Sequence, residues 1–522
     1  MKESIIILGA GVMQGPAIRI AKEMGFFTIT LDGSSKAPCI SMADQFEQID
    51  LKDKESIELF ARSLQSKNSC LGIMTAGTDF SASVAWTAEK LGLPGIPYEA
   101  ALNASDKSRM RACFKKASLP SPEFITITAQ NSLDNITLPF PLVIKPVDNM
   151  GSRGCRRVDS IEDLREAAQT ALGFSRSGRA IVEAFMDGPE FSVDAIVYHG
   201  EITICGLADR HIFFPPYFIE MGHTMPTIIE KEKQQAILET FRAGIRALGL
   251  AGENSIGAAK GDIKLTANGP MIGEIAARLS GGYMSGWTYP YSSGVQPIRA
   301  AILAAMGRKP NGLVPEKNWT CAERACISIP GTVKTIFGTE KAQKQTFVND
   351  IFLRIEEGSN VSFPENNVTK CGNVIAASPD RDSAVAAAEV AARSILIRLE
   401  SADTKTSDFL TSTAAFPPDA FQLTDSQQAA LAQLPEFAAQ KDSDGENYSI
   451  IAFPAFTSSG LLDYTGRTIE ETLEAVRFLT GFPLPVAEKN ADNKNILGRS
   501  FWIAFIRGSY QGAVYYIDNW LK

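Results

Sequence analysis

The chain has few histidines, no closely spaced cysteine pair and no long hydrophobic run. The three histidines, His199, His211 and His223, are too few and too dispersed for a zinc site, and the eight cysteines form no CxxC pair. This scatter predicts neither a zinc site nor a disulfide framework, and it favours reduced thiols. No apolar run approaches the roughly 20 residues needed to span a bilayer. The first residues lack the pattern of a signal peptide. We therefore expect a soluble cytoplasmic protein.

The chain also lacks an excess of positive charge. Its formal net charge is −8, which does not favour a general nucleic-acid or anionic-membrane partner. A length of 522 residues predicts about three or four domains. The hydrophobic fraction of 45% is ordinary and permits large cores.

Residues 1–105 alternate between strand and helix patterns. A buried strand at 5–8 leads through a glycine turn at 9–15 into a helix, and a second strand ends at Asp32. Two interpretations stay open: a dinucleotide-binding turn, or a turn used only for close packing. The loop 75–79 follows another strand, where open α/β sheets bind ligands, although it is also suited to capping a helix.

The stretch 261–282 predicts a hairpin. A strand at 262–266 and a strand at 271–275 flank a turn at 267–270, which places Asp262 and Glu274 side by side on one face. Two adjacent carboxylates repel unless a cation lies between them, and hard oxygen ligands suit Mg²⁺. Arg278 would face the same pocket and could hold an anion. The alternative is a solvated surface hairpin.

Lys145 ends an apolar strand and is followed at once by a glycine-rich loop, 149–154. A buried ammonium needs a partner, and the amides of such a loop can cradle phosphates. A hairpin loop with an edge lysine explains the glycines but not the lysine. Lys107, just after the helix cap Ser105-Asp106, is ordinarily a solvated first-turn residue. A bend at 184–189 between two strands could hold an adenine edge, with Glu190 near the ribose.

In this order the parts resemble the ATP-grasp superfamily, and most closely its carboxylate–amine ligases of the amino-acid ligase type. The resemblance rests on SDK (105–107), PLVIKP (141–146), NMGSRG (149–154), VEAFMDGPEFSVD (182–194), DIKLT (262–266) and GEIAARLSGG (273–282). The loop PPYFIEMGHTMP (215–226) is similar to a loop of that branch.

The resemblance implies a multidomain α/β and α+β fold. A Rossmann-like pre-ATP-grasp domain would cover 1–105 and an ATP-grasp domain 106–300, whose small lid subdomain lies within 106–190. A C-terminal lobe that closes the ligase core would cover 301–400. A polar linker would follow at 401–421, then an extra α+β module of unknown role at 422–522.

The resemblance also implies roles for individual residues. Lys107 and Lys145 would contact ATP phosphates beneath a lid formed by Gly151, Ser152 and Gly154. Glu183, Ala184 and Met186 would read adenine, and Glu190 would bind ribose. Asp262 and Glu274 would hold Mg²⁺, or Mn²⁺ in its place. Arg278 would hold the acyl phosphate or substrate carboxylate beside Ser280, Gly281 and Gly282. Glu220 and His223 could line the second-substrate pocket.

Two positions depart from the family pattern. Asp262 stands where the family usually has Glu, which keeps the chemistry with one methylene fewer. Ala276 stands where it usually has Asn, a metal ligand or orienter. Water can replace a lost oxygen around octahedral Mg²⁺, so turnover with weaker metal binding is one expectation. A non-catalytic ATP-binding protein is another.

The C-terminal part of the sequence carries no catalytic pattern. An alanine-rich helix is predicted at 382–399. Helices are predicted at 425–434 and 468–480, the second opened by a capping box of Thr468 and Glu471. Strands are predicted at 449–453, 501–507 and 513–517. The aromatic residues of this region favour a packing face over a cofactor site.

The function that these patterns favour is an ATP-dependent ligase that joins small-molecule carboxylate and amine substrates through an acyl phosphate. The resemblance also allows a homodimer. A purine-synthesis or carboxylase-type ligase of the same fold is an alternative. So are the non-catalytic ATP-binding regulator and, on the glycine turn alone, an NAD-dependent oxidoreductase.

Overall fold

The computed structural model describes residues 3–66, 70–130, 133, 136–436, 448–457, 460–487 and 495–520. The chain divides into two compact units. Unit 1 consists of Met1–Glu323 and Ala376–Val385, and unit 2 of Arg324–Ile375 and Ala386–Lys522. The range predicted as a C-terminal lobe therefore contributes to both units. Each unit is described by itself.

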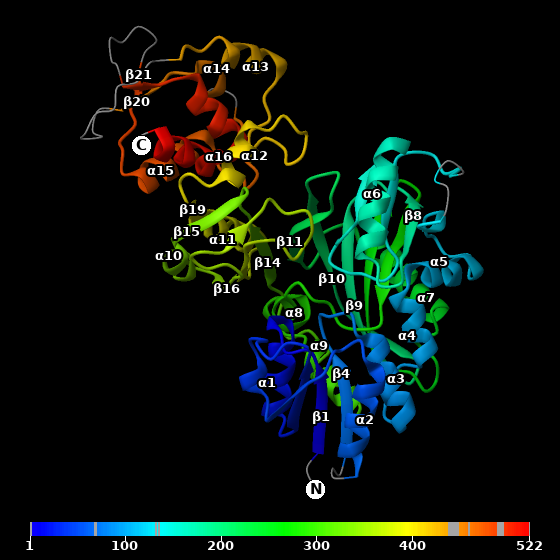
Figure 1. The fold of residues 1–522 in the computed structure, drawn as a ribbon. Coiled ribbons are helices and arrows are strands. Elements are labelled where there is room, and N and C mark those ends of the chain that lie inside the picture. The colour runs from blue at the N-terminus through cyan, green and yellow to red at the C-terminus, as the bar shows by residue number, and fades with distance from the viewer. Residues whose placement is uncertain are drawn as a thin grey trace. The chain divides into compact units, whose positions relative to one another are not determined.

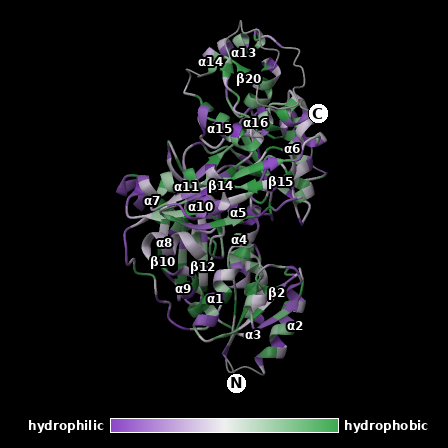
Figure 2. Cartoon of the chain, turned by 90° about the vertical axis from the view of Figure 1, so that its left-hand side faces the viewer, coloured by the Kyte–Doolittle hydropathy of each residue, from purple (hydrophilic) through white to green (hydrophobic). Residues whose placement is uncertain are grey.

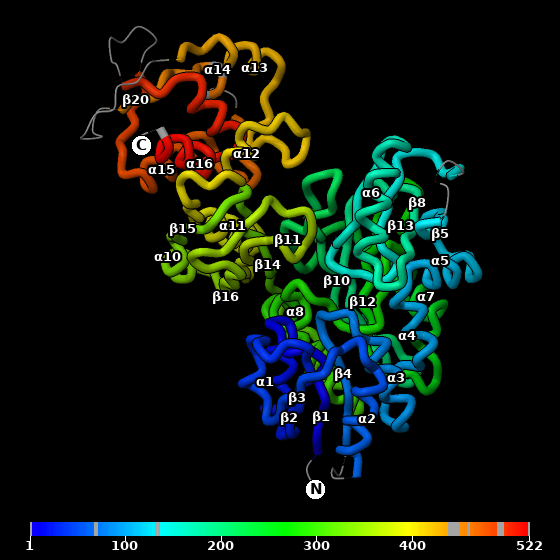
Figure 3. The backbone as a smooth tube through the Cα atoms, viewed as in Figure 1, coloured from blue at the N-terminus to red at the C-terminus, as the bar shows by residue number. Residues whose placement is uncertain are grey.

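The N-terminal part of unit 1 is a parallel four-stranded sheet of order β3-β2-β1-β4, traced in blue in Figure 3. Its strands are β1 (Glu3–Leu8), β2 (Phe27–Asp32), β3 (Gln45–Gln48) and β4 (Cys70–Thr75). Helices α1 (Gly15–Glu23), α2 (Lys54–Gln65), α3 (Ser81–Leu91) and α4 (Tyr98–Ser105) follow the strands. Strand β1 is covered on both faces, since Ile5 and Ile7 pack in one hydrophobic core and Ile6 and Leu8 in another. The Rossmann-like expectation is confirmed.

A second, antiparallel sheet has the order β5-β8-β6-β7. It consists of β5 (Phe124–Thr128), β6 (Leu142–Pro146), β7 (Arg156–Val158) and β8 (Arg179–Ala184), with helices α5 (Lys107–Lys116) and α6 (Ile161–Phe174). Helix α6 packs on one face through residues such as Leu164 and Ala168, against Ile144 and Val182 of the strands (Figure 1). Because side chains alternate along a strand, Lys145 and Glu183 lie on the other face.

The larger antiparallel sheet of unit 1 includes, in order, β13 (Gly269–Ala276), β12 (Ile256–Thr266), β9 (Glu190–Tyr198), β10 (Glu201–Phe213) and β11 (Ile219–Met225). One face is apolar and packs against α4, α5 and α7 (Lys231–Ala247). Phe241 of α7 and Ile263 of β12 are both fully buried in this core. The other face carries charged side chains, Lys260 and Asp262 among them. This alternation positions the candidate site.

Unit 1 also contains a π-helical turn Met284–Thr288 and the helices α8 (Tyr289–Ser293) and α9 (Pro297–Ala305). Helix α9 joins the hydrophobic core of the first sheet, since Ile298 and Ile302 pack with Ile5 and Ile7. Three elements, β14 (Thr320–Cys326), β18 (Gly372–Ser378) and α11 (Arg381–Ser394), extend across the division between the units.

Unit 2 contains two small sheets of orders β17-β15-β19 and β21-β20-β22. Their strands are β15 (Gly331–Phe337), β17 (Asn360–Val361), β19 (Leu396–Leu399), β20 (Ser449–Ile451), β21 (Val486–Ala487) and β22 (Ile496–Leu497); β16 is Val348–Leu353. The helices are α10 (Thr339–Gln343), α12 (Thr404–Thr411), α13 (Asp425–Ala432), α14 (Pro454–Thr457), α15 (Ile469–Thr480) and α16 (Arg499–Trp520). Hydrophobic residues gather around β20 and α16 (Figure 2).

The strands predicted at 501–507 and 513–517 are wrong, because both lie within helix α16. Phe501, Trp502 and Phe505 are all buried, so the helical period is hidden in a nearly continuous apolar run. Such a run does not distinguish a strand from a buried helix. The helices predicted at 425–434 and 468–480 are confirmed as α13 and α15, and the strand at 449–453 as the shorter β20.

Two further ranges differ from expectation. The helix predicted at 382–399 ends at Ser394, and Leu396–Leu399 forms strand β19, in which Ile397 and Leu399 are buried. The range 401–421, predicted as a linker, contains helix α12 and the fully buried Phe421. Among the described residues, no helix combines the length and apolar character that a membrane span requires.

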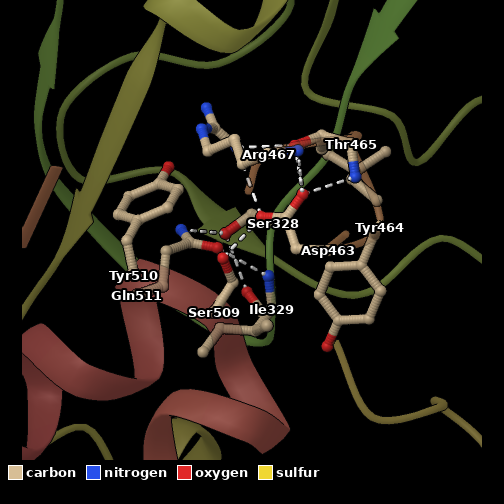
Figure 4. A pocket seen from close by; sticks show the side chains of 10 residues that line it. Ser328, Ile329, Asp463, Tyr464, Thr465, Arg467, Ser509, Tyr510 and Gln511 are labelled. Atoms are coloured by element: carbon tan, nitrogen blue, oxygen red, sulfur yellow. Dashed lines mark hydrogen bonds and ion pairs between the residues drawn. The ribbon is translucent and has the colours of Figure 1, made fainter. Parts of the chain in front are cut away.

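Helix α16 is kinked at Ser509, whose φ of 52° and ψ of −147° are not helical. The Ser509 hydroxyl donates to the buried carboxylate of Asp463 at 2.6 Å, as Figure 4 shows. The other oxygen of Asp463 accepts from the amides of Thr465 at 2.8 Å and Arg467 at 3.0 Å. A backbone conformation this unusual for serine persists only where its surroundings hold it.

Candidate active site

The two carboxylates predicted to share a face are opposite each other across the β12–β13 hairpin. Asp262 pairs directly with Glu274, and a register shift follows between Asp262 and Ile263. Residues directly opposite in an antiparallel pair lie on the same face with their Cβ atoms close together. The predicted juxtaposition is confirmed. The turn is shorter than predicted, because β13 already begins at Gly269.

Lys107 reaches the hairpin from the first turn of α5. Its ammonium lies 3.2 Å from Glu274 Oε1 and donates to the carbonyl of Asn149 at 2.8 Å. Burial alone would lower the pKa of Lys107, but the charges of Glu274 and Asp79 raise it. Burial disfavours the ionised form of Glu274. The positive charge of Lys107 opposes this effect, followed by the charges of Lys260 and Lys145, and the Glu274 pKa is lowered to about 2. Both groups are therefore charged at neutral pH.

Lys145 is held by a buried ion-pair chain. Its ammonium lies 2.7 Å from Glu183 Oε2, and Arg111 Nε donates to Glu183 Oε1 at 2.8 Å. Arg111 also donates to the carbonyl of Gly273 at 2.6 Å, beside Glu274. Burial opposes the charge on Glu183, but the two cations lower its pKa below the ordinary value. Both Glu183 oxygens thus contact cations, where the resemblance expects a contact to the adenine amino group.

The glycine-rich loop follows β6 and begins at the carbonyl that Lys107 contacts. Gly151, Ser152 and Gly154 all have positive φ, at 68°, 61° and 67°. Glycine adopts this conformation without strain, which is why such a loop can turn its amides in one direction. A side chain at Gly154 would also meet Phe174 and Pro146.

The bend after β8 is the predicted adenine hinge. The amide of Ala184 donates to the carbonyl of Glu123 at 3.0 Å, so it is already bonded. Phe185 lies between Ala184 and Met186. The Arg157 guanidinium lies over the Phe185 ring, 4.7 Å from its centroid, and the ring stacks on Phe218 with the two centroids 6.5 Å apart. The hinge therefore carries an aromatic ring and a cation that the sequence reasoning did not single out.

A third cluster centres on Arg210 of β10, whose side chain is 10% exposed. Its guanidinium forms ion pairs with Glu190, with Glu220 at 2.7 Å and with Asp262 at 3.0 Å. Burial raises the pKa of Glu190, an effect that Arg210 opposes and the charge of Asp262 increases. Arg210 thereby brings together the residues expected at the ribose, at the second substrate and at the metal.

Arg278 and the segment after it lie beyond the end of β13. Arg278 Nη1 donates to the Leu279 carbonyl at 3.0 Å, and its Nε has no hydrogen-bond partner among the described residues. Ser280 donates its hydroxyl to Asp194 at 2.5 Å. Gly281 lies against Gly77 of the loop that follows β4, where an added side chain would meet the Gly77 backbone. Gly282 has a φ of 59°.

His223 is fully buried in β11. Its Nε2 is 2.7 Å from the Thr288 hydroxyl, and its Nδ1 is 3.3 Å from Glu323 and 3.9 Å from Glu220. These contacts connect His223 to Glu220 but not to the lysines around Glu274. The expectation that both residues line a substrate pocket stays a prediction.

Several charged residues of the site were missed by the sequence reasoning: Arg111, Asp194, Arg210, Lys260 and Lys264. Lys260, Asp262 and Lys264 have the even spacing that places side chains on one face of a strand. Arg111 lies four residues after Lys107, on the same side of a helix. These spacings were available in the sequence. Arg210 carried no such local signal, because its partners come from other strands.

The donor set around the hairpin fits a divalent cation bound together with phosphates. Asp262 and Glu274 supply hard oxygens from adjacent strands, and each forms an ion pair with a lysine, Lys260 and Lys107 respectively. Mg²⁺ is usually bound by one or two carboxylates plus substrate phosphates rather than by a full protein cage. Lysines around the same carboxylates suit the phosphate charge. The arrangement can therefore hold a metal–nucleotide pair.

Comparison with known proteins finds two family matches within the chain. Residues 138–286 match the ATP-grasp domain family, so the chain contains an ATP-grasp domain. Residues 324–400 match the L-amino acid ligase C-terminal domain 2, which narrows the class. The L-amino acid ligase from Bacillus licheniformis superposes with a TM-score of 0.68 at 21% identity, over 76% of this chain and 99% of that one. This likeness shows a shared fold.

The matches to curated relatives cover smaller parts of those proteins. Carnosine synthase 1 of Gallus gallus is 24% identical over 338 residues, which cover 59% of this chain and 36% of that protein. A D-alanine–D-alanine ligase of Marinobacter nauticus is 33% identical over 131 residues, or 24% of this chain and 39% of that one. The chain spans 65% or less of the length of the curated relatives it matches.

Proposed function

We propose that this chain is an ATP-dependent carboxylate–amine ligase, which forms an amide and releases ADP and phosphate. The observation that carries the proposal is the opposition of Asp262 and Glu274 across one hairpin, next to lysines from separate elements. Lys107 contacts Glu274 directly, Lys260 contacts Asp262, and Lys145 acts on Glu274 through its charge. This pattern of paired acids and surrounding cations suits the charge of a metal–triphosphate.

In this proposal the nucleotide lies along the charged faces of the two antiparallel sheets. Lys107 and Lys145 bind phosphates, and the loop of Gly151, Ser152 and Gly154 covers them. Ala184 and Met186 border the adenine, and Glu190 binds ribose. Glu183 is assigned here to orienting Lys145 rather than to the adenine amino group, since both of its oxygens contact cations.

The chemistry requires positioning and charge neutralisation more than a protein nucleophile. A carboxylate oxygen of the first substrate attacks the γ-phosphorus, the bond to ADP breaks, and an acyl phosphate forms. The amine nitrogen of the second substrate then attacks the acyl carbon, and phosphate leaves. Asp262 and Glu274 would hold Mg²⁺, which neutralises phosphate charge. Arg278, Ser280, Gly281 and Gly282 would hold the acyl phosphate, and the glycine loop would exclude water.

Amino-acid-like substrates are the class that the comparisons support best. One relative is named as a D-alanine–D-alanine ligase, and residues 324–400 match an L-amino acid ligase domain. Glu220 and His223 are the proposed lining of the second-substrate pocket. The two are 3.9 Å apart, and Arg210 connects Glu220 to the metal ligand Asp262.

The test is release of ADP in the presence of Mg²⁺, ATP and a mixture of amino acids, followed by single pairs. K145A and E274A are expected to lower turnover by about 100-fold or more, the usual loss when one preorganised charge contact is removed. K344A and E340A are matched controls, because their side chains are 80% and 95% exposed. Full turnover in K145A or E274A contradicts the assignment.

One observation favours a second function, an ATP-binding regulator without turnover. Ala276 is buried, offers no side-chain oxygen, and pairs across the strands with Lys260, which places a cation where the family pattern has a ligand. Calorimetric binding of Mg²⁺–ATP without ADP release from any carboxylate and amine pair supports this alternative. A requirement for bicarbonate or a phosphorylated amine supports a carboxylase-type or purine-synthesis ligase.

A further inference from the structure

Asp194 is a buried acid on the charged face of β9, and no role is assigned to it above. It lies two residues beyond Ser192, whose hydroxyl donates to Asp262 at 3.2 Å, so the two side chains share a face. Asp194 is 0% exposed. In register it stands beside Lys260 of β12. A carboxylate this deep is costly unless nearby groups compensate its charge.

One oxygen of Asp194 is bonded to the segment that follows Arg278. Oδ2 accepts from the Ser280 hydroxyl at 2.5 Å and from the Ser280 amide at 3.2 Å. The same segment is held elsewhere, because the Ser285 hydroxyl donates to the Ser280 carbonyl at 2.6 Å and the Gly77 amide to the Leu279 carbonyl at 3.2 Å. Asp194 is thus the acidic anchor of this segment.

The other oxygen of Asp194 has no hydrogen-bond partner among the described residues, and neither has Nε of Arg278. Arg278 is 9% exposed. The charged groups that act on Asp194 are Lys260 of β12 and Arg278 after β13. Cys205 of β10 and Tyr289 of α8 are the titratable neighbours on the remaining sides.

We propose that Asp194 is a positioning residue of the ligase site: its carboxylate anchors Ser280 and thereby fixes the segment that presents Arg278, two residues earlier, to the acyl phosphate. The inference rests on the proposed function. A residue needed only for packing would be better served by an uncharged side chain, since a buried charge costs stability. Asp194 therefore trades stability for the orientation of a guanidinium.

The direction of the pH effect follows from the surroundings of Asp194. Burial raises its pKa to about 6, while the Ser280 hydrogen bonds, Lys260 and Arg278 oppose that rise. The charge is present above about pH 6, so turnover should fall as the pH drops through 6. For stability the sign is opposite. The folded-state pKa lies above the ordinary 3.8, so ionised Asp194 destabilises the fold above pH 6, and this cost disappears at low pH.

The experiment compares D194N, which removes the charge, with S280A, which keeps the charge and removes one donor. T87V is the matched control, because Thr87 is fully buried and its hydroxyl has no partner among the described residues. D194N should lower kcat/KM for the carboxylate substrate by about tenfold to a hundredfold, as expected for loss of a charged contact. Its affinity for Mg²⁺–ATP should stay within about twofold of the wild type, and its melting temperature should not fall.

The pH profile separates positioning from a general structural role. The acid limb near pH 6 should be absent in D194N. In S280A it should persist and move to higher pH, because the lost hydrogen bond lowered the Asp194 pKa. An unchanged limb and unchanged kcat/KM in D194N overturn the inference. A parallel loss of ATP affinity and melting temperature does the same.

Failure of the proposed function has a different signature. If the wild type releases no ADP with any substrate pair, the proposed function fails. The Asp194–Ser280 interaction is then tested by hydrogen exchange of residues 278–285. After correction for intrinsic rates, protection of the Ser280 amide should be greater at pH 7.5 than at pH 5 in the wild type. That difference should vanish in D194N and persist in T87V. Equal protection in wild type and D194N contradicts the inference.

Discussion

At the scale of residues, the site is a set of short ion pairs between buried or half-buried groups. The chain from Arg111 through Glu183 to Lys145 lies beside the pair of Lys107 and Glu274. Buried pairs of this kind add little stability compared with apolar residues, but they are costly to break. Their value in the proposed ligase is that each cation is already oriented before phosphate binds.

Arg111 provides a direct test of that reasoning. R111M leaves the fully buried Glu183 with one cation instead of two, and we expect it to lower the free energy of unfolding by about 3–5 kcal/mol. R19M is the control, because the Arg19–Glu23 pair is exposed and should contribute about 1 kcal/mol or less. Chemical denaturation measures both.

The double variant R111M/E183Q completes this comparison. Removing the charge of Glu183 as well should restore part of the lost stability, since no buried carboxylate is then left without its guanidinium. A single R111M variant that is no less stable than R19M would contradict the account of the buried ion-pair chain.

How far the sequence predicts the site is visible residue by residue. Strand periodicity and the short hairpin turn predict that Asp262 and Glu274 lie side by side, and the register confirms it. Lys145 was singled out because an apolar strand that ends in lysine is unusual. Arg210 was not found, because its partners Glu190, Glu220 and Asp262 lie on three other strands. A side chain whose partners are all non-local leaves no periodic signal.

At the scale of elements, local signals predicted helix starts better than they predicted buried segments. The capping box of Thr468 and Glu471 is present at the start of α15, with both reciprocal hydrogen bonds. The interior of α16 was predicted as two strands, because burial of residues such as Phe501 and Trp502 removes the contrast between apolar and polar positions. Two or three neighbouring residues are enough to predict a helix cap, whereas the burial of a segment depends on how the whole unit packs.

The kink of α16 supplies the prediction at this scale. D463A removes the carboxylate that accepts from Ser509, Thr465 and Arg467, and it leaves the buried Arg467 without its acid. We expect a loss of about 3–5 kcal/mol in unfolding free energy. T468A, which removes one helix cap in the same unit, should cost only about 1 kcal/mol.

Thermal unfolding monitored together with Mg²⁺–ATP affinity distinguishes the possible results. The residues proposed to bind the nucleotide lie in unit 1, so D463A should reduce stability while ATP affinity stays within about twofold. An effect of D463A no larger than that of T468A would show that Asp463 does not hold the strained Ser509 conformation.

At the scale of the whole molecule, the sequence order of motifs predicted the class better than any single motif. The turn at residues 9–15 opens a Rossmann-like sheet, and its Gln14 side chain donates to the carbonyl of Ala76 and accepts from the amide of Gly11. These contacts fill the turn with the chain's own groups, as in the packing interpretation. The division at 401–421 stays a prediction; helix α12 lies within this range, and the boundaries of the two compact units lie elsewhere.

The central claim, that a carboxylate is activated by direct phosphoryl transfer from ATP, is tested by following oxygen. A carboxylate substrate with ¹⁸O in both carboxylate oxygens is incubated with ATP, Mg²⁺ and an amine, and the released phosphate is analysed by mass spectrometry. The account predicts one ¹⁸O atom in each phosphate, formed together with ADP, because the attacking carboxylate oxygen leaves with the phosphate. Amide formation with unlabelled phosphate, or with AMP as the nucleotide product, would contradict it.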